Sequence, residues 1–169
     1  MASAIEACGM ALPFNASNPA ISKDKKDECI SLGESLKNII VKDLKPRDIV
    51  THKSIENALR LISVLGGSTN AVLHLLAIAR EAGVNLTLEE FDAISARTPV
   101  LADLKPGGRY TAPDLTAAGG VGLLAKYLLD GGLLNDVPTV TGRRLSEEVN
   151  EVLAAPEQPV VRTLTNPLK

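Results

Sequence analysis

The sequence predicts a mainly α segment of an α/β domain, with about seven helices and one or two short strands. A length of 169 residues is enough for one ordinary domain. Hydrophobic residues make up 45% of the chain but aromatic residues only 2%, so the core must consist of Leu, Ile, Val and Ala. Most of these apolar residues recur at helical spacing, and too few strand-like runs remain for a parallel sheet of four or more strands. We therefore expect residues 1–169 to form a single, partial domain.

The first 41 residues predict two helical stretches separated by a loop. Residues 1–10 are small and apolar around a single charge, Glu6, with no leader, which suggests a start inside a longer chain. A loop rich in Pro, Asn and Ser follows. Ser22 is a suitable N-cap, and apolar residues at helical spacing from Cys29 to Ile40 predict a helix that runs to about Val41.

Two further helices are expected to meet at a pair of glycines. Residues 42–48 are a charged connector stopped by Pro46. After a Thr51 cap, apolar residues at helical spacing predict an amphipathic helix over 52–65 that points at Gly66-Gly67. The second helix starts after these glycines, continues to Ala82 and stops at Gly83, a residue suited to a left-handed C-terminal position.

Residues 84–104 predict a capped helix and then a short strand. Thr87 and Glu90 have the spacing of a capping box, and the helix that they start ends before Pro99. The apolar run 100–104 has the length of a buried strand, and the Pro-Gly-Gly turn at 106–108 closes it.

The last third of the chain alternates short helices with glycine and proline breaks. A helical turn from Pro113 is broken at Gly119-Gly120, and the next helix ends at residues 131–132. Residues 138–141 suit a brief strand, and the final helix runs from Leu145 to Leu153. The prolines that follow predict an extended tail over about 155–169.

The main candidate binding site is the run Gly66, Gly67, Ser68, Thr69 and Asn70 at the start of the second of the paired helices. Glycines let a ligand approach the backbone, and the first-turn N–H groups of a helix have no intrahelical partner, so this start can attract an anion. The alternative is structural: Ser68 or Thr69 merely caps a buried helix, and the glycines allow close packing.

Three further features have a functional and a structural interpretation. His74 lies one turn after Asn70 and is either a ligand or, more often in such an apolar run, a core histidine. The run 105–110, Lys-Pro-Gly-Gly-Arg-Tyr, places two cations around a turn that is otherwise simply solvated. Gly119-Gly120 opens a helix but lacks the motifs of a dinucleotide or phosphate loop. No set of residues stands out as catalytic.

Charge and cysteine content exclude several classes of partner. The net charge is −2, with 18 basic and 20 acidic residues spread along the chain, so we expect neither nucleic acid nor a membrane as a partner. Cys8 and Cys29 are too few and too far apart to form a metal site, so no metal ligand is predicted and both thiols are expected to be free. These features are typical of a cytoplasmic protein.

An ordered set of motifs resembles the dihydroxy-acid dehydratase family, which also contains phosphogluconate and sugar-acid dehydratases. In order, these are MASAIEACGMALP, SNPA, KPRDIVTHKSIENA, LGGSTNAVLHLLAIAREAGV, FDAIS, PVLADLKPGGRY, DL, GG and TVTG, which together extend over the whole chain. The form of SNPA and KPRDI favours the dihydroxy-acid branch.

The resemblance implies a hydro-lyase that converts a 2,3-dihydroxy acid to a 2-keto acid in branched-chain amino-acid biosynthesis. It implies an iron–sulfur cluster and magnesium in the parent enzyme, which we expect to be a homodimer with a small dihydroxy acid as substrate. The ligands of both cofactors and the catalytic base fall outside the matched motifs, and Cys8 and Cys29 match no cluster cysteine. We therefore expect this chain alone to bind neither cofactor and to be inactive, with the family's sheet incomplete.

Two other functions remain open from the sequence. A sugar-acid or phosphogluconate dehydratase shares much of the pattern. A non-catalytic interaction module derived from a dehydratase is the alternative from another class, because Ile5 and Met10 are expected to leave an apolar face on the first helix.

Overall fold

The computed structural model describes every residue from Met1 to Lys169 and contains nine helices and no β-sheet. This confirms a mainly α segment, although with nine helices rather than seven. β-Pairing is limited to three isolated bridges, which join Ala102 to Val161, Leu104 to Tyr110 and Pro138 to Arg144. The helices are α1 (Ala2–Ala7), α2 (Lys23–Val41), α3 (Pro46–Ile49), α4 (His52–Val64), α5 (Thr69–Ala82), α6 (Leu88–Ala96), α7 (Ala112–Ala118), α8 (Gly120–Asp130) and α9 (Leu145–Val149).

Helix α4 is the centre of the fold. Ten of its thirteen residues are buried, so it has almost no solvent-facing side. Leu61 and Val64 belong to a core of 19 buried residues that includes α8, α9 and the C-terminal tail. Ile55 and Leu59 belong to a second core of 11 buried residues, which is shared with α5 and α6. The position of α4 therefore fixes where its C-terminal end presents the Gly66-Gly67 turn.

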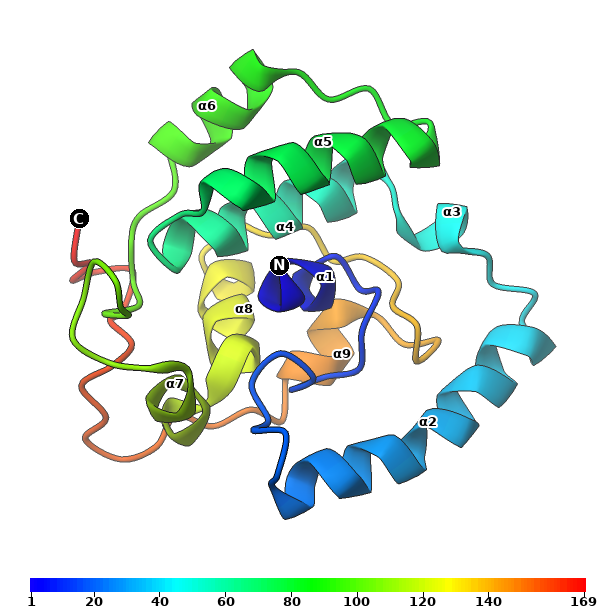
Figure 1. Ribbon diagram of the computed structural model, residues 1–169, viewed down its shortest axis with the longest axis horizontal. Helices are drawn as coiled ribbons and strands as arrows, with labels where there is room; N and C mark the ends of the chain where they lie inside the picture. Colours follow the sequence, from blue (N-terminus) through cyan, green and yellow to red (C-terminus); the bar gives the residue numbers. More distant parts are fainter.

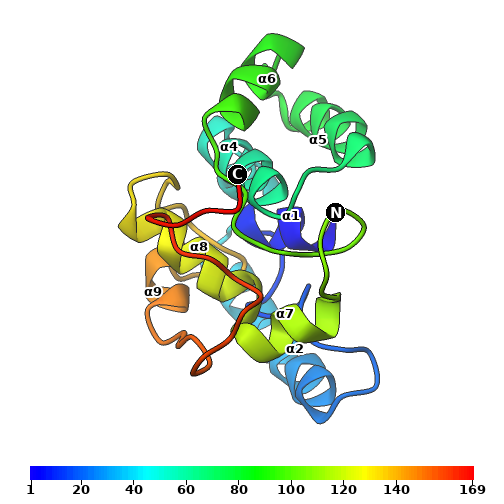
Figure 2. The ribbon, with the colours of Figure 1, turned by 90° about the vertical axis from the view of Figure 1, so that its left-hand side faces the viewer.

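Helix α1 joins the two cores. Ala4 and Cys8 pack in the core shared with α5 and α6, whereas Ala7 packs in the larger core. In Figure 1 α1 lies at the middle of the molecule, with α4 and α5 above it and α8 and α9 beside it. In Figure 2 the helices α4, α5 and α6 form one end, and α2 and α7 lie at the other.

The helix caps agree with the sequence-based expectations. Ser22 Oγ accepts a hydrogen bond from Lys25 N (3.1 Å), and Thr51 caps α4 in the same way. The capping box of α6 is complete, since Glu90 N donates to Thr87 Oγ1 (3.2 Å) and Thr87 N donates to Glu90 Oε2 (3.1 Å). Gly83 ends α5 at φ +78°.

Several predicted elements differ in the structure. The charged connector at 42–48 contains the one-turn helix α3, because Pro46 at its first position costs no hydrogen bond there. The strands expected at 100–104 and 138–141 are reduced to isolated bridges, since the segments beside them pair at single positions and not as continuous ladders. The last helix stops at Val149, four residues before the predicted end.

The proline-containing tail has no helix, as expected, but it is not merely a solvated extension. Val160 and Val161 are buried in the larger core. Asp103 N donates to Val160 O (2.9 Å) and Arg162 N donates to Leu101 O (2.8 Å). The tail therefore pairs with the segment that sequence alone predicted as a strand.

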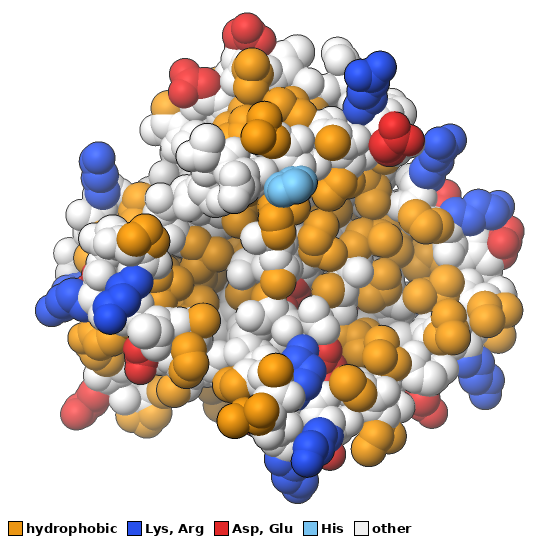
Figure 3. Space-filling model, viewed as in Figure 1, with side chains coloured by type: hydrophobic (Ala, Val, Ile, Leu, Met, Phe, Trp, Pro, Cys, Tyr) orange, Lys and Arg blue, Asp and Glu red, His pale blue; other side chains and the backbone are white.

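Helix α2 stands away from both cores. The helix predicted to run to about Val41 is confirmed, and none of its 19 residues is buried. Figure 1 shows α2 as an arm at the edge of the molecule, and Figure 3 shows hydrophobic side chains gathered on the face between this arm and α5. No helix is both long and apolar enough to cross a membrane.

Candidate functional site

The Gly66-Gly67 turn closes α4 with a Schellman arrangement. Gly67 N donates to Ile62 O (2.8 Å) and Gly66 N donates to Ser63 O (3.0 Å), which satisfies the last carbonyls of the helix. The φ angles are +99° for Gly66 and +85° for Gly67. A Cβ atom at either glycine would meet nothing within 4 Å, so close packing does not explain these residues. Glycine is favoured at both positions because the backbone there is left-handed, and the space beside both residues is open.

Ser68 caps the helix that follows. Its backbone is extended, at φ −163° and ψ +119°, and its Oγ accepts from Ala71 N (3.4 Å), which confirms the capping interpretation. Thr69 and Asn70 form the exposed first turn of α5, where N–H groups have no intrahelical acceptor. All five residues of the predicted site lie together at the surface. The N–H groups of Gly66 and Gly67 are used within the turn, so the first turn of α5 holds the donors that an anion could reach.

His74, one turn further along α5, is exposed and not a core histidine. Only Ala71, Leu75 and Ala79 of this helix are buried, so the remainder of its apolar run faces outward. The structural alternative of a buried helix therefore holds for one stripe of α5 only, which packs in the core shared with α4.

A polar cavity of about 530 Å³ lies beside the glycine turn. Its walls come from the end of α4, the glycines and the end of α6. Ser63 Oγ lies 3.4 Å from Ser95 Oγ across this junction. Arg97 lines the cavity and donates through Nε to Ala93 O (3.0 Å), which leaves its terminal nitrogens without a protein partner. Lys169 also lines the cavity, which therefore combines hydroxyl groups and two basic side chains next to an open turn.

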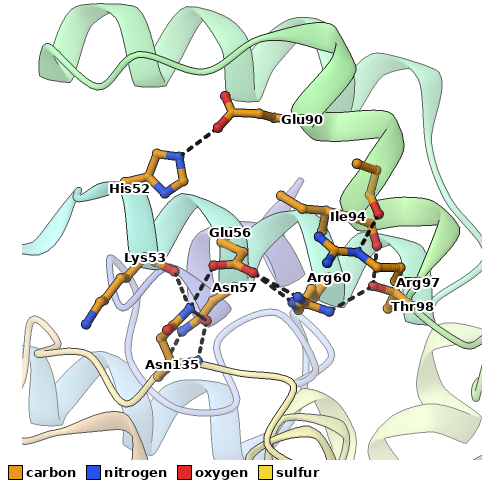
Figure 4. Close-up of polar contacts among 11 residues, drawn as sticks. His52, Lys53, Glu56, Asn57, Arg60, Glu90, Ile94, Arg97, Thr98 and Asn135 are labelled. Carbon is orange, nitrogen blue, oxygen red and sulfur yellow. Dashed lines mark hydrogen bonds and ion pairs between the residues drawn. The ribbon is translucent and has the colours of Figure 1, made fainter.

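A polar network along α4 holds this helix in register (Figure 4). The central contact joins Asn57, which is fully buried, to the backbone of Asn135: Asn57 Nδ2 donates to the carbonyl oxygen (2.7 Å), and its Oδ1 accepts from the amide (2.8 Å). Sequence analysis missed Asn57, although an amide within the apolar stripe of 52–65 was a visible signal. With these two hydrogen bonds, the Asn57 side chain pairs with the backbone of Asn135 as another backbone amide would. It thereby joins α4 to the segment after α8.

The same network reaches α6 through charged groups. Arg60 Nη2 donates to Glu56 Oε1 (2.8 Å), and its Nη1 donates to Thr98 Oγ1 (3.4 Å). Burial opposes ionisation of Glu56, but the hydrogen bonds from Arg60 and Asn135 outweigh it and hold the pKa of Glu56 below its usual value. Arg60 is therefore committed to the fold and is not a free anion ligand.

Two carboxylates missed by sequence analysis, Glu6 and Glu148, line the same small cavity of about 20 Å³. Glu6 of α1 accepts from Phe14 N (2.9 Å) and Ala16 N (2.8 Å), which ties the loop after α1 to the helix. Glu148 of α9 accepts from the hydroxyl groups of Thr139 (2.5 Å) and Thr141 (2.6 Å). The lone charge among apolar residues at the start of the chain was the available signal for Glu6.

Burial dominates the ionisation of both carboxyl groups. It raises the pKa of Glu6 to about 7, against the two backbone N–H bonds, and the charges of Glu28 and Glu148 add to the rise. Burial likewise raises the pKa of Glu148, although the two threonine hydroxyls oppose it. Both threonines of the Thr-Val-Thr-Gly run at 139–142 donate to Glu148, which links this run to α9.

One of the two cations in the 105–110 turn, Arg109, forms an ion pair within the chain. Arg109 donates from Nε to Asp103 Oδ2 (2.7 Å) and from its backbone N to Oδ1 (3.0 Å). A Cβ at Gly108 would lie 2.4 Å from Asp103 Oδ1, so glycine is required there. Leu101 N and Ala102 N both donate to Val64 O (3.1 Å), which places the segment before this turn against the end of α4. No hydrogen bond or ion pair joins the turn itself to residues 66–70.

At the start of α8, after the second glycine pair, the side chain of Ser17 occupies the space beside the helix. Ser17 Oγ accepts from Val121 N (3.0 Å), and a Cβ at Gly120 would approach this oxygen to 2.7 Å. Gly119-Gly120 is therefore a packing feature, in contrast to the open Gly66-Gly67 turn.

Comparisons with known proteins give a consistent result. A family model described as "Dihydroxy-acid/6-phosphogluconate dehydratase N-terminal" matches residues 1–148. Dihydroxy-acid dehydratases from Lactococcus lactis subsp. cremoris (strain SK11) and Francisella tularensis subsp. novicida (strain U112) are 50% and 51% identical over 172 and 171 residues. That of Flavobacterium psychrophilum is 50% identical over 171 residues. These alignments cover 100% of this chain but only 30%, 30% and 31% of the relatives, so the chain spans about 30% of their length.

Proposed function

The chain belongs to the dihydroxy-acid/6-phosphogluconate dehydratase family, and we propose that it forms part of a hydro-lyase that dehydrates a 2,3-dihydroxy acid to a 2-keto acid. The observation that carries this proposal is identity near 50% along the whole chain to relatives named dihydroxy-acid dehydratase. The proposal includes a role in branched-chain amino-acid biosynthesis, a cytoplasmic location and a homodimeric complete enzyme.

Within this proposal, Gly66, Gly67, Ser68, Thr69 and Asn70 form one wall of the substrate pocket. The exposed first turn of α5 offers backbone N–H groups to a carboxylate or hydroxyl of the acid. The adjacent cavity adds the unpaired terminal nitrogens of Arg97, a cation suited to a carboxylate. Of the five residues, Gly66 and Gly67 line this cavity.

The residues present do not form a site for the iron–sulfur cluster or the magnesium ion that the resemblance implies. No group of three or more His, Cys, Asp or Glu side chains is arranged to hold a metal. Cys8 is buried and Cys29 is exposed on α2, so the two thiols do not act together. We derive no step of the reaction through either group.

Transplantation into a relative tests the proposed function. In this chimera, the chain replaces the matched 172 residues of the Lactococcus lactis strain SK11 dehydratase. We expect the chimera to form a 2-keto acid from a 2,3-dihydroxy acid, measured as its hydrazone, and to prefer this substrate to sugar acids and phosphogluconate. A folded, cofactor-loaded chimera without turnover would contradict the proposal, and a preference for a sugar acid would favour the related activity.

Thr69→Ala in the chimera tests the substrate-binding wall. Ser68 caps α5, so its replacement changes stability as well, whereas Thr69 makes no capping bond. We expect Thr69→Ala to raise KM several-fold, by about 1 kcal/mol of binding, with an unchanged melting temperature. An unchanged KM would remove this residue from the site.

A non-catalytic interaction module is the alternative function. Ile5 and Met10, which motivate it, are both only partly buried. A stable complex between the isolated chain and an intact dehydratase, measured by light scattering, together with an inactive chimera, would favour this alternative.

A further inference from the structure

The end of α6 forms one wall of the polar cavity beside the Gly66-Gly67 turn, and little apolar packing holds it there. Ile94 is the one buried residue of this nine-residue helix. Polar contacts join α6 and the residue pair after it to α4 at three places: His52 with Glu90 (3.3 Å), Ser63 with Ser95 (3.4 Å) and Arg60 with Thr98 (3.4 Å). Side-chain polar contacts with α4 therefore help to fix where this wall stands.

Arg60 makes the contact at the C-terminal end of α6. Its side chain is buried and has two partners on opposite sides, as Figure 4 shows. Nε and Nη2 donate to Glu56 Oε1 (3.2 and 2.8 Å), and Nη1 donates to Thr98 Oγ1 (3.4 Å). Because the guanidinium group is planar and rigid, the bonds to Glu56 set the direction in which Nη1 points. Arg60 therefore fixes the place of Thr98 relative to α4.

Thr98 transmits this constraint to Arg97. Thr98 is buried, and its Oγ1 both accepts from Arg60 and donates to Ile94 O (2.7 Å), which closes the last turn of α6. The preceding residue, Arg97, donates from Nε to Ala93 O (3.0 Å). The backbone of Arg97 is thus held by its buried neighbour and its side chain by the helix, which leaves only the terminal nitrogens to turn toward a ligand.

Stability alone is a weak reason for an arginine at this position. The attraction within a buried ion pair is offset by the desolvation of both charges, so apolar residues of similar volume often stabilise a fold as well. A guanidinium group supplies what an apolar side chain cannot, namely a hydrogen bond of fixed direction. Glu56, its partner, is itself held from the segment after α8, because Glu56 Oε2 accepts from Asn135 Nδ2 (3.1 Å). This chain of contacts is suited to setting geometry across three parts of the fold.

We propose that Arg60 is a positioning residue for substrate binding, which acts through Thr98 to hold Arg97 at the cavity beside the Gly66-Gly67 turn. The inference rests on the proposed function, in which the terminal nitrogens of Arg97 bind the carboxylate of a 2,3-dihydroxy acid. Arg60 itself does not touch the acid, because it does not line the cavity and each of its three nitrogens already has a partner.

Arg60→Lys in the chimera tests the inference. A lysine keeps the charge beside Glu56 but has a single donor group, which cannot also reach Thr98 in the direction of Nη1. We expect KM for the dihydroxy acid to rise on the order of fivefold or more, with kcat changed less than about twofold, because the lost contact acts on binding. An unchanged KM would overturn the inference.

Two substitutions of Thr98 test the same contact from its other side. Thr98→Val keeps the shape of the side chain and removes the hydroxyl group, whereas Thr98→Ser keeps the hydroxyl group. We expect Thr98→Val to raise KM as Arg60→Lys does, and Thr98→Ser to stay within about twofold of the unsubstituted chimera. Equal KM values for the two variants would show that the hydroxyl group has no positioning role.

Ile94→Val is the control for a merely structural effect. It removes one buried methylene group from the same end of α6 and leaves every polar contact in place, and Ile94 does not line the cavity. We expect a lower melting temperature with an unchanged KM. If Ile94→Val raises KM as much as Arg60→Lys does, loosening of α6 in general is the cause and the inference is wrong.

A double-mutant cycle tests whether Arg60 acts through Arg97. Arg97→Gln removes the cation at the cavity and should raise KM by itself. If Arg60 only positions Arg97, Arg60→Lys has no further effect on KM in the Arg97→Gln chimera. Effects that multiply in full would show that the two residues act independently and would contradict the inference.

The outcomes separate this inference from the proposed function. An active chimera in which Arg60→Lys leaves KM unchanged refutes only the inference. If the chimera forms no keto acid, calorimetric titration with the dihydroxy acid gives the same comparison as a ratio of Kd values. Weaker binding by the Arg60→Lys variant then supports the inference while the function is refuted, and a chimera that neither binds nor converts the acid refutes both.

Discussion

Replacing Asn57 by alanine tests how α4, and with it the Gly66-Gly67 turn, is held in place. The buried amide pairs with both the N–H and the C=O of Asn135, at 2.8 Å and 2.7 Å. Alanine removes both bonds and leaves two backbone groups without partners where α4 meets the segment after α8. No other side chain within the network can replace these contacts, because Arg60 and Glu56 are already paired.

The structure sets the size of the effect. Each backbone group that loses its partner costs about 1–3 kcal/mol, and Asn135 is partly accessible to water, which lowers the cost. We therefore expect Asn57→Ala to reduce the free energy of unfolding by about 2–4 kcal/mol. Asn135→Ala is the matched control: it removes only side-chain bonds, the shortest being the 3.1 Å contact with Glu56, and should cost less than about 1 kcal/mol.

Urea denaturation followed by circular dichroism measures both variants. Asn57→Asp adds a sharper comparison, because an ionised carboxylate would face the carbonyl oxygen of Asn135, whereas a protonated one can still donate to it. Asn57→Asp should therefore be closer to the wild-type protein at pH 3 than at pH 7. If Asn57→Ala costs no more than Asn135→Ala, the two-bond pairing does not hold α4 and the reasoning is wrong.

The remaining predictions concern pH, the glycines and the cofactors. Because the folded pKa of Glu6 is about 7 and its ordinary value is 4.5, its contribution to stability is complete below pH 4.5 and is lost as the pH rises through 7. The loss approaches about 3 kcal/mol. Glu6→Gln should flatten this part of a pH–stability curve, and an unchanged slope would contradict the assignment. Gly66→Ala should destabilise the chain by about 1 kcal/mol, because the φ angle of Gly66 is positive. Gly33→Ala should stabilise it by a similar amount, because Gly33 lies inside α2 with open space beside it. Equal effects of the two substitutions in thermal denaturation would refute this distinction. After reconstitution with iron and sulfide, the isolated chain should show no cluster absorbance, and a stable visible band would show that it carries a ligand set.

The helical elements were predictable because their signals are local. The caps at Ser22, Thr51 and Thr87 depend on residues within one turn, and the structure confirms each of them. The α-rich class followed from composition and periodicity. The helix start at 66–70 was also predictable, because its residues are consecutive in the sequence, whereas ligand binding there stays a prediction.

The strands and the burial of α2 were not predictable in the same way, because both depend on a partner. Residues 100–104 have the composition of a strand, but a sheet requires a continuous partner strand, and this segment forms only two isolated bridges, one to Val161 of the tail and one to Tyr110. The stripe on α2 has helical period, yet periodicity does not say whether anything covers it.

The sequence by itself determined the caps that start α2, α4 and α6, the family, and which glycines are candidates for an open turn. Only the tertiary structure decided that Gly66-Gly67 is open while Gly119-Gly120 is filled by Ser17, since the two pairs look alike in sequence. It also brought Glu6 to Glu148 and Asn57 to Asn135, which are separated by 142 and 78 residues. The physical reason is that caps and turns are fixed by bonds within a few residues, whereas access, burial and ionisation depend on what the rest of the chain places alongside.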